Sequence, residues 1–310
     1  MGDYTEKQRC INVCLSCDDK YSLYAGVVIA SILSNANWDD DLSIYVLDGG
    51  VSDIRKQQIL SLKSIKDCNI QFVSINSSDF DEYKKVCTHK YITIATYYRL
   101  KLASLLPNVD KIIYFDCDMV VNSSLKELFN TDLTDYLVAG VQDINKKMVK
   151  KNPHYVNAGM LVFNLDLIRK ENVEGQFLKY TQENFESIKC GDQTIINEVC
   201  KDKLKLLNPV WNVQSSNFTN RSNYVNNPRV VHFVAKNKPW GGKSYSYHKN
   251  LYFKYLQLTP WKINEDELRQ NLKSTAIAYF KYRPLFFLRP RFYEAFVKTY
   301  IKPLFVKENI

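Results

Sequence analysis

Apolar and polar stretches alternate regularly along the first 120 residues of the chain. The runs typical of buried strands are 10–17, 42–48, 69–75 and 111–115, and the segments with helical patterns between them are 23–35, 51–65 and 96–106. Strands that alternate with helices predict an α/β fold, with a mainly parallel central sheet flanked by helices on both faces. In such sheets, ligands bind beyond the carboxyl ends of the strands.

Two pairs of aspartates fall at the predicted ends of strands. Asp18 and Asp19 follow the first strand, and Asp116 and Asp118 follow the fourth, on either side of Cys117. Residues two apart share a face of an extended chain, so the Asp116 and Asp118 carboxylates are expected to face the same way. Two such charges repel each other and lose hydration, so something must compensate them.

A divalent metal shared with a phosphate ligand would compensate the two carboxylates. Carboxylate oxygens suit Mg²⁺ or Mn²⁺, and a diphosphate supplies further oxygen ligands. His232, at the end of a short predicted strand, can add a nitrogen ligand, which favours Mn²⁺. Lys238 can then neutralise a phosphate. The alternative is that Asp116 and Asp118 begin a turn and cap the next helix, and that Asp192 likewise only caps a helix.

No glycine-rich phosphate loop follows the first strand, where the sequence from residue 17 is CDDKYSLYAG. A nucleotide site of the dinucleotide-binding type is therefore not predicted. A nucleotide can still bind through the metal, with a tyrosine ring against the base.

Composition limits the class of protein but does not choose a function. The chain has 310 residues, of which 45% are hydrophobic and 24% charged, so it can form a large core and is not disordered. The net charge of +9 favours an anionic partner such as nucleic acid, acidic lipid or a phosphorylated substrate.

The eight cysteines are scattered, which indicates reduced thiols in a cytoplasmic protein. Cys14 and Cys17 form a C-x-x-C inside the first predicted strand, where packing is the main interpretation and a redox or zinc site the alternative. Neither a signal peptide nor a membrane-spanning run is predicted.

The segment from about Asn271 onward has a different composition. Between 276 and 305, aromatic residues alternate with cations, and Glu294 is the single acid; the cations are Lys281, Arg283, Arg289, Arg291, Lys298 and Lys302. Prolines divide the segment into short helices. This pattern suits an anionic membrane surface. The alternative is a helical cap packed on the preceding domain.

Five motifs, in order, resemble glycosyltransferase family 8, and most closely the bacterial lipopolysaccharide α-galactosyl- and glucosyltransferases. They are CDDKYSLYAGVVIASI, TYYRLKLASLLPNVDKIIYFDCDMVV, YVNAGMLVFNL, GDQTIIN and HFVAKNKPW, and they span about 11–240. The resemblance implies a GT-A fold, a UDP-sugar donor, Mn²⁺ (with Mg²⁺ as the alternative) and retention of the anomeric configuration.

The resemblance also implies roles for individual residues. The implied metal ligands are Asp116, Asp118 and His232. The implied nucleotide-binding residues are Asp18, Asp19, Tyr21, Cys117 and Lys238. The implied sugar pocket contains Arg99, Asn157, Ala158, Gly159, Asp192 and Gln193. The implied catalytic group is Gln193, Asp192, Arg99 and, near the acceptor, Asp143.

The implied chemistry is cleavage of the bond between the sugar C1 and UDP. A metal and Lys238 would stabilise the negative charge that develops on the diphosphate. Gln193 is the residue expected near C1, and its amide is a poor nucleophile. A front-face displacement through a short-lived ion pair is therefore expected, with a covalent intermediate on Asp192 as the alternative.

The expected function is transfer of galactose or glucose onto a saccharide acceptor, lipid-linked or free, in lipopolysaccharide or capsule synthesis at the inner face of the cell membrane. Residues 1–270 would form the catalytic domain, with a nucleotide-binding half at about 10–120 and a sugar and acceptor half at about 121–270. Residues 271–310 would form the basic aromatic tail.

Two other functions remain open at this stage. A glycogenin-like self-glucosylating primer is suggested by the 21 tyrosines. A basic nucleic-acid-binding protein is suggested by the charge, but the chain has no recognised nucleic-acid motif, and no nucleic acid partner is expected.

Overall fold

The computed structural model describes residues 10–86, 93–215, 225, 227–234, 238–241, 246, 248–282, 293–294 and 296–302. The strands are β1 (Ile11–Cys17), β2 (Leu42–Asp48), β3 (Asn69–Ser74), β4 (Lys111–Phe115), β5 (Met119–Val121), β6 (Val138–Gln142), β7 (Val156–Asn164), β8 (Leu204–Leu206), β9 (Val213–Gln214) and β10 (Val230–His232). The strands predicted in the first 120 residues are confirmed to within one residue at each end.

A seven-stranded sheet forms the centre of the molecule, in the order β3-β2-β1-β4-β7-β6-β8. The pairs β1–β2, β1–β4, β2–β3 and β6–β8 are parallel, whereas β7 is antiparallel to both β4 and β6. The predicted mainly parallel sheet is therefore confirmed. Because β7 is reversed, its beginning lies at the same edge as the ends of β1 and β4.

A three-stranded sheet, in the order β5-β10-β9, adjoins this edge. Strand β10 pairs antiparallel with β5, so His232 lies opposite Met119. This pairing brings residues 230–232 next to the chain that leaves Asp118.

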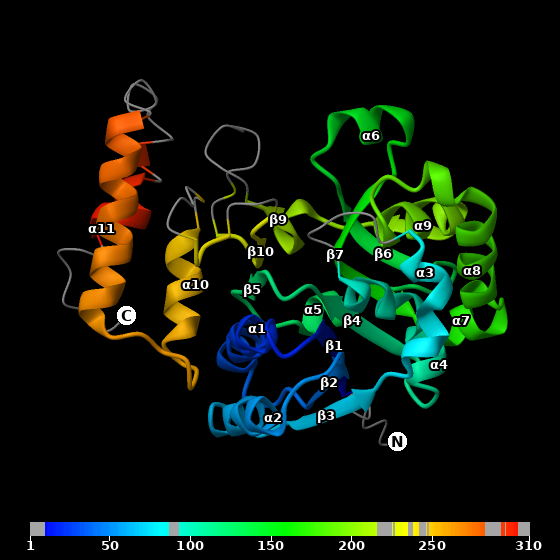
Figure 1. Ribbon diagram of the computed structural model, residues 1–310, viewed down its shortest axis with the longest axis horizontal. Helices are drawn as coiled ribbons and strands as arrows, with labels where there is room; N and C mark the ends of the chain where they lie inside the picture. The colour runs from blue at the N-terminus through cyan, green and yellow to red at the C-terminus, as the bar shows by residue number, and fades with distance from the viewer. Residues whose placement is uncertain are drawn as a thin grey trace, which may run out of the picture.

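The side chains of β4 show how the central sheet is covered on both faces. Ile113 and Phe115 belong to one buried cluster, with α1 and β2, and the alternate residues Ile112 and Tyr114 belong to a second cluster, with η3, α8 and α9. Figure 1 shows α1 and α2 on one side of the sheet and α8 and α9 on the other. The near-continuous apolar sequence of β4 reflects burial on both faces.

The helices follow the predicted order. They are α1 (Ser22–Asn35), α2 (Asp53–Leu60), α3 (Asp81–Lys84), α4 (Leu102–Leu105), α5 (Lys126–Phe129), α6 (Lys146–Lys151), α7 (Leu165–Lys170), α8 (Val173–Asn184), α9 (Asp192–Val199), α10 (Lys249–Leu256) and α11 (Glu265–Tyr282). Short 3₁₀ helices are η1 (Ser61–Ser64), η2 (Ser77–Phe80), η3 (Ile94–Lys101), η4 (Phe185–Ser187), η5 (Lys201–Lys203) and η6 (Pro209–Trp211), and η9 (Val297–Ile301) is a π-helix.

One of the predicted helices is only partly α-helical. The segment 96–106 is mostly the 3₁₀ helix η3, and only its last part is α-helical. Ser52 occupies the N-cap position of α2, but its side chain makes no capping bond. Ile54 of that helix is 75% exposed.

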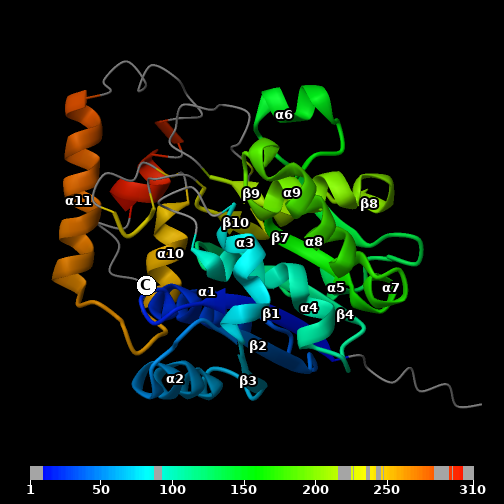
Figure 2. The ribbon, with the colours of Figure 1, turned by 45° about the vertical axis from the view of Figure 1, so that its right-hand side comes forward.

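The C-terminal part of the described chain packs beside α1 and β10. Leu268, Leu272 and Ala276 of α11 and Phe296 are buried in one cluster with Phe233 and residues of α10. Helix α11 runs across position 270, where the tail was expected to begin. Figure 2 shows α11 and α10 side by side at one end of the molecule. Residues 283–292, 295 and 303–310 of the expected tail lie outside the described residues.

None of the helices in the described part of the chain combines the length and the hydropathy that a membrane span requires.

Candidate active site

The Asp-Cys-Asp segment lies where β4 ends at the carboxyl edge of the sheet. The Asp116 backbone N–H donates to the Gly159 carbonyl at 2.8 Å, which is the last contact with β7, and Cys117 and Asp118 then form a turn into β5. The extended geometry expected from Asp116 to Asp118 does not persist. The helix-capping alternative is also wrong, because strand β5 follows directly and α5 begins only at Lys126.

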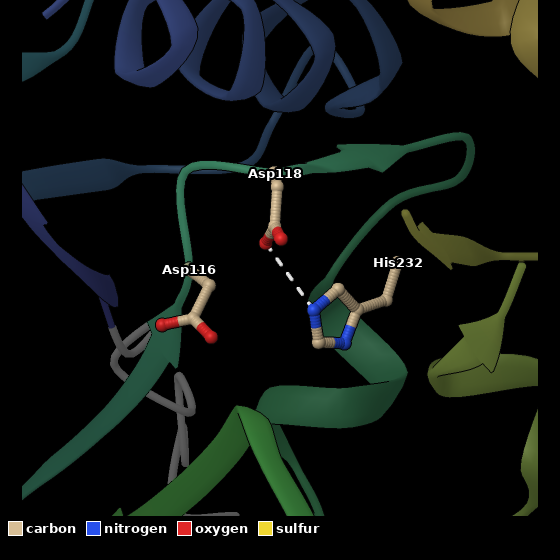
Figure 3. A group of neighbouring side chains, drawn as sticks. All are labelled: Asp116, Asp118 and His232. Atoms are coloured by element: carbon tan, nitrogen blue, oxygen red, sulfur yellow. Dashed lines mark ion pairs between the residues drawn. The ribbon is translucent and has the colours of Figure 1, made fainter. Parts of the chain in front are cut away.

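Asp116, Asp118 and His232 form a group that can hold a metal ion. Each offers one ligand atom, and these atoms all lie within 4.8 Å of one another. Figure 3 shows the two carboxylates and the imidazole turned toward a common centre, with the dashed line between Asp118 and His232. The turn therefore brings together the three ligands that the resemblance implies.

The hydrogen bonds of Asn157 determine which nitrogen of His232 is available. Asn157 Oδ1 accepts from the Gly159 N–H and from Asn212 Nδ2, each at 3.1 Å, so it acts as an acceptor. His232 Nδ1 lies 3.0 Å from the same oxygen and must therefore donate its proton there. His232 Nε2 is therefore the ring nitrogen that faces the metal group.

The atoms that meet at the centre of this group require a cation. His232 Nε2 lies 3.2 Å from Asp118 Oδ1, and that oxygen is buried without a hydrogen-bond donor among the described residues. Two electron-pair donors at this distance repel each other unless a proton or a metal ion lies between them. The oxygen and nitrogen ligands suit Mn²⁺ or Mg²⁺, so the residues fit the implied metal.

Gly159 leaves the space that the His232 ring occupies. A Cβ atom at position 159 would lie 2.2 Å from His232 Cε1 and 2.6 Å from Nδ1. The Asn157-Ala158-Gly159 segment has the composition of a turn, but it lies inside β7 and is buried. Its small residues therefore serve to admit the imidazole beside the strand.

Arg99 connects the metal group to the sugar side of the site. It is 2% exposed, and its guanidinium contacts Asp116 Oδ1 at 2.5 Å and Asp192 Oδ2 at 3.0 Å. Its NH1 also donates to the Ala158 carbonyl at 2.5 Å, and it lies over the Tyr114 ring at 4.1 Å. One buried cation thus compensates two carboxylates.

The acidities of the carboxyl groups reflect this arrangement. Burial raises the pKa of Asp192 to about 6, although Arg99 acts in the opposite direction. Loss of hydration likewise raises the pKa of Asp116. For Asp118, burial is outweighed by Lys238 and His232, which hold its pKa below its usual range. Asp192 is the first helical residue of α9 and Gly191 occupies the N-cap, so the simple capping role is wrong.

Lys238 makes an ion pair with Asp118 and donates to the Phe233 carbonyl at 2.8 Å. The neighbouring Trp240 stacks on Tyr24 of α1, with ring centroids 3.8 Å apart. This stacking anchors residues 238–241 to α1. The Lys238 ammonium is therefore held beside Asp118 of the metal group.

Gln193 and Asp143 form a polar network with Asn157 of β7, which also contacts His232. Gln193 Oε1 accepts from the Ala158 N–H at 3.0 Å and from Asn157 Nδ2 at 3.3 Å. Gln193 Nε2 donates to Asp143 Oδ2 at 3.1 Å, and Asn157 Nδ2 donates to the same oxygen at 3.0 Å. The amide of Gln193 therefore has a fixed orientation, and the network extends through Asn157 to His232.

The expected nucleotide-binding residues also make contacts within the protein. Asp18 Oδ1 accepts from the Tyr21 N–H at 2.8 Å, and Asp19 Oδ1 accepts from the Ser52 N–H at 2.9 Å. Cys117 is buried, and its thiol donates to the Ser16 carbonyl at 3.2 Å. Their contact with a nucleotide stays a prediction.

Three residues that take part in the site were missed by the sequence reasoning. Asn212 donates to Asn157, Tyr155 lies 3.4 Å from Gln193 Nε2, and Asn197 pairs with both backbone groups of Val156. Tyr155 and Asn197 lie within two of the quoted motifs. Because they are neutral, no charge pattern identified them.

Comparisons with known proteins identify the family of the chain. The sequence model of glycosyl transferase family 8 matches residues 12–244. The chain belongs to glycosyltransferase family 8. The predicted family is therefore confirmed, and family membership favours an enzyme over the nucleic-acid-binding alternative.

Similar chains are found among both protein sequences and solved structures. A putative glycosyltransferase of Haemophilus influenzae is 33% identical over 247 residues, covering 75% of this chain and 74% of that protein. The lipopolysaccharide 1,2-glucosyltransferase of Escherichia coli is 24% identical over 283 residues, covering 83% and 81%. The crystal structure of galactosyltransferase LgtC with donor and acceptor sugar analogs superimposes with a TM-score of 0.72 at 24% identity, covering 84% of this chain and 100% of LgtC. This likeness confirms the GT-A fold.

Proposed function

We propose that this family 8 glycosyltransferase transfers a hexose, galactose or glucose, from a UDP-sugar to a saccharide acceptor of a bacterial surface glycan, with Mn²⁺ and with retention of configuration. The observation that carries the proposal is the group of Asp116, Asp118 and His232, whose ligand atoms all lie within 4.8 Å of one another, with His232 Nε2 3.2 Å from Asp118 Oδ1. The similarity to a lipopolysaccharide glucosyltransferase supports the class of acceptor.

Different residues of the site would have different roles in the reaction. Asp116, Asp118 and His232 would hold the metal, which when bound stabilises negative charge on the leaving diphosphate. Lys238 supplies a further positive charge at the same place. Asp192 is engaged by Arg99, which makes its carboxylate a weaker nucleophile and supports the front-face route over a covalent intermediate.

The test is hydrolysis of UDP-galactose and UDP-glucose with and without Mn²⁺, followed by an acceptor screen. Asp116→Ala, Asp118→Ala and His232→Ala should each lower turnover by about 100-fold or more, since ligand loss exceeds the effect of outer residues. Titration of Mn²⁺ by electron paramagnetic resonance gives a readout independent of turnover. Full activity in excess chelator would contradict the proposal. The intact mass after incubation with UDP-glucose tests the glycogenin-like alternative.

Gln193→Ala should lower turnover much more than it lowers UDP affinity. Within the described chain, the hydrogen bonds of the amide include those to Asp143, Asn157 and the Ala158 N–H, and none goes to the expected nucleotide-binding residues. Equal losses of UDP binding and of rate would contradict this placement. A sugar adduct trapped on Asp192 would establish the covalent route.

We also propose that the protein is cytoplasmic and that its C-terminal segment binds the anionic inner face of the membrane. The buried Ala276 and Phe296 support a packing role for part of this segment, so truncation would confuse the two roles. Lys298 and Lys302 are exposed, and replacing both by Gln removes charge without removing the packed residues. Binding to phosphatidylglycerol vesicles should weaken. Unchanged vesicle binding at low salt would argue against the membrane role.

A further inference from the structure

The connection between β6 and β7 is strongly basic. It extends from Asp143 to Tyr155, and between these two residues it contains four lysines and no acidic residue. The lysines are Lys146, Lys147, Lys150 and Lys151, and all four are exposed. They are four of the 42 lysines and arginines of a chain whose net charge is +9.

Helix α6 (Lys146–Lys151) gathers the four lysines on one face. Lys146 and Lys150 are four residues apart, as are Lys147 and Lys151, and Met148 and Val149 are half-buried on the other face. In the described part of the chain, no carboxylate lies within ion-pair distance of any of the four. Like charges at this spacing destabilise a helix. Lys150 and Lys151 lie in the last turn, where a cation is favourable, whereas Lys146 and Lys147 lie in the first turn, where it is not.

The base of this connection is part of the active site. The Asp143 N–H donates to the Tyr155 carbonyl at 3.0 Å, which closes the loop, and the Ile144 N–H donates to Gln214 Oε1 at 3.1 Å. Asp143 Oδ2 in turn accepts from Gln193 and Asn157. The rigid base thus fixes α6 relative to the group that lies next to the expected sugar pocket.

The position of α6 separates it from the C-terminal helices. Figures 1 and 2 show α6 projecting above β6, β7 and α9, whereas α11 lies apart from it at the left of both views. Residues 144–154 also contain no Phe, Trp or Tyr. Helices that bind membrane interfaces use such residues as apolar anchors, so a lipid surface is the less suitable partner for α6.

We infer that α6 binds the saccharide acceptor through negative charges on that acceptor, so that the natural acceptor carries several phosphate or carboxylate groups. The inference rests on the proposed function, because it takes the Asp143 side of the site as the acceptor side. Lysine ammonium groups bind such anions as point charges, and their exposure leaves them available to a ligand that arrives from solvent. Charge attraction also raises the local concentration of an anionic acceptor beside Gln193.

The test compares three oligosaccharides of the same length: neutral maltotriose, trigalacturonate and chemically phosphorylated maltotriose. Isothermal titration measures the binding of each to the full chain with UDP and Mn²⁺ present. The anionic oligosaccharides should bind about tenfold more tightly than maltotriose, the order of magnitude expected for four exposed ion pairs. The two anionic probes distinguish phosphate from carboxylate. The difference should shrink in 0.5 M NaCl, since salt screens exposed charges.

A charge-removal variant and a matched control locate the effect. The variant combines Lys146→Gln, Lys147→Gln, Lys150→Gln and Lys151→Gln, and the control combines Lys63→Gln, Lys170→Gln, Lys179→Gln and Lys201→Gln, which are exposed lysines on other elements. Both lose the same charge. The preference for anionic oligosaccharides should disappear in the variant and persist in the control.

Three results would overturn the inference. One is equal binding of neutral and anionic oligosaccharides by the unsubstituted protein, which does not depend on whether the variant folds. Another is an equal loss of the preference for anionic oligosaccharides in the variant and in the control. That result would mean that the net charge of the protein, and not its location on α6, causes the preference. The third is that the variant loses binding to phosphatidylglycerol vesicles but keeps its preference for anionic oligosaccharides. Hydrolysis of UDP-sugars by the unsubstituted protein tests the proposed function separately. A failure of the proposed function can therefore be distinguished from a failure of this inference.

Discussion

Arg99 and the lysines of α6 carry the same charge in opposite surroundings. Arg99 is buried between Asp116 and Asp192, whereas the four lysines are exposed and have no carboxylate partner among the described residues. The buried cation compensates charges that belong to the protein itself. The exposed cations are available for a charge that arrives from outside. Burial therefore decides whether a cation here supports the fold or attracts a ligand.

Removing the buried cation should have the largest effect on stability. Arg99→Met leaves Asp116 and Asp192 unpaired, so the free energy of unfolding should fall by about 3–5 kcal/mol. Urea denaturation at pH 7 measures this fall. Lys170→Met removes an exposed cation paired with Asp166 and serves as the control, with an expected loss below about 0.5 kcal/mol. Similar losses in the two variants would mean that Arg99 does not compensate the carboxylates.

The raised pKa of Asp192 predicts a dependence of stability on pH. Its pKa in the folded protein is about 6, above the usual value of 3.8, so the folded state favours the protonated form. The contribution of Asp192 is fully present below pH 4 and is lost as the pH rises through 6, amounting to about 3 kcal/mol.

The substitution Asp192→Asn should remove the loss of stability that accompanies ionisation of Asp192 as the pH rises. Between pH 4 and pH 7, the free energy of unfolding of the variant should rise more steeply, or fall less, than that of the unsubstituted protein. Asp202→Asn, at an exposed aspartate in η5, is the control and should follow the unsubstituted protein. Parallel curves for all three proteins would contradict the assignment.

A substitution at Asn157 tests whether its hydrogen bonds support metal binding by Asp116, Asp118 and His232. Asn157→Ala removes the acceptor that orients His232 Nδ1, and such outer partners typically contribute 10–100-fold to metal affinity, so Mn²⁺ should bind about 10–100-fold more weakly. Titration of Mn²⁺ by electron paramagnetic resonance measures the change. Asn130→Ala, at an exposed position after α5, should leave the affinity unchanged. If both variants bind Mn²⁺ equally well, His232 is oriented by other contacts.

Removing the exposed cations should have the smallest effect, with the opposite sign. Replacing the four lysines of α6 by Gln relieves three like-charge pairs at i,i+3 or i,i+4 spacing, so the free energy of unfolding should rise by about 0.5 kcal/mol. The gain should decrease at high salt. Urea denaturation in 20 mM and 500 mM NaCl checks both points. A loss of stability would show that these lysines have partners within the protein, and the comparison with Arg99 would then fail.

The sequence predicted the strands well because burial on both faces gives apolar runs that end at charged or glycine residues. The run 42–48 corresponds to β2 residue for residue. The pattern could not reveal the reversed direction of β7, because the polarity of a buried strand does not depend on its direction. Likewise, Asn157-Ala158-Gly159 has the composition of a turn, and only the contact with His232 explains why small residues occupy a strand.

Most of the candidate site was predictable for a different reason. Charged residues at the ends of buried strands are unusual, and this directed attention to Asp116, Asp118 and His232, which the structure brings together. The neutral residues Tyr155, Asn197 and Asn212 could not be found in this way, because a buried amide or hydroxyl shows its importance only through its tertiary partners. The nucleotide contacts of Asp18, Asp19, Tyr21 and Cys117 stay predictions.

The pairing of β5 with β10 has a consequence for the order in which the site is made during synthesis. Arg99 precedes Asp116 by 17 residues, but Lys238 follows Asp118 by 120 residues. At ribosomal speeds of about 5–20 residues per second, Lys238 is synthesised roughly 6–24 s after Asp118. During that interval Asp116 already has a partner in the nascent chain, whereas Asp118 has none of the partners it has in the finished fold. The metal group is therefore completed late, and a growing chain cannot bind its ion through all three ligands before β10 has left the ribosome.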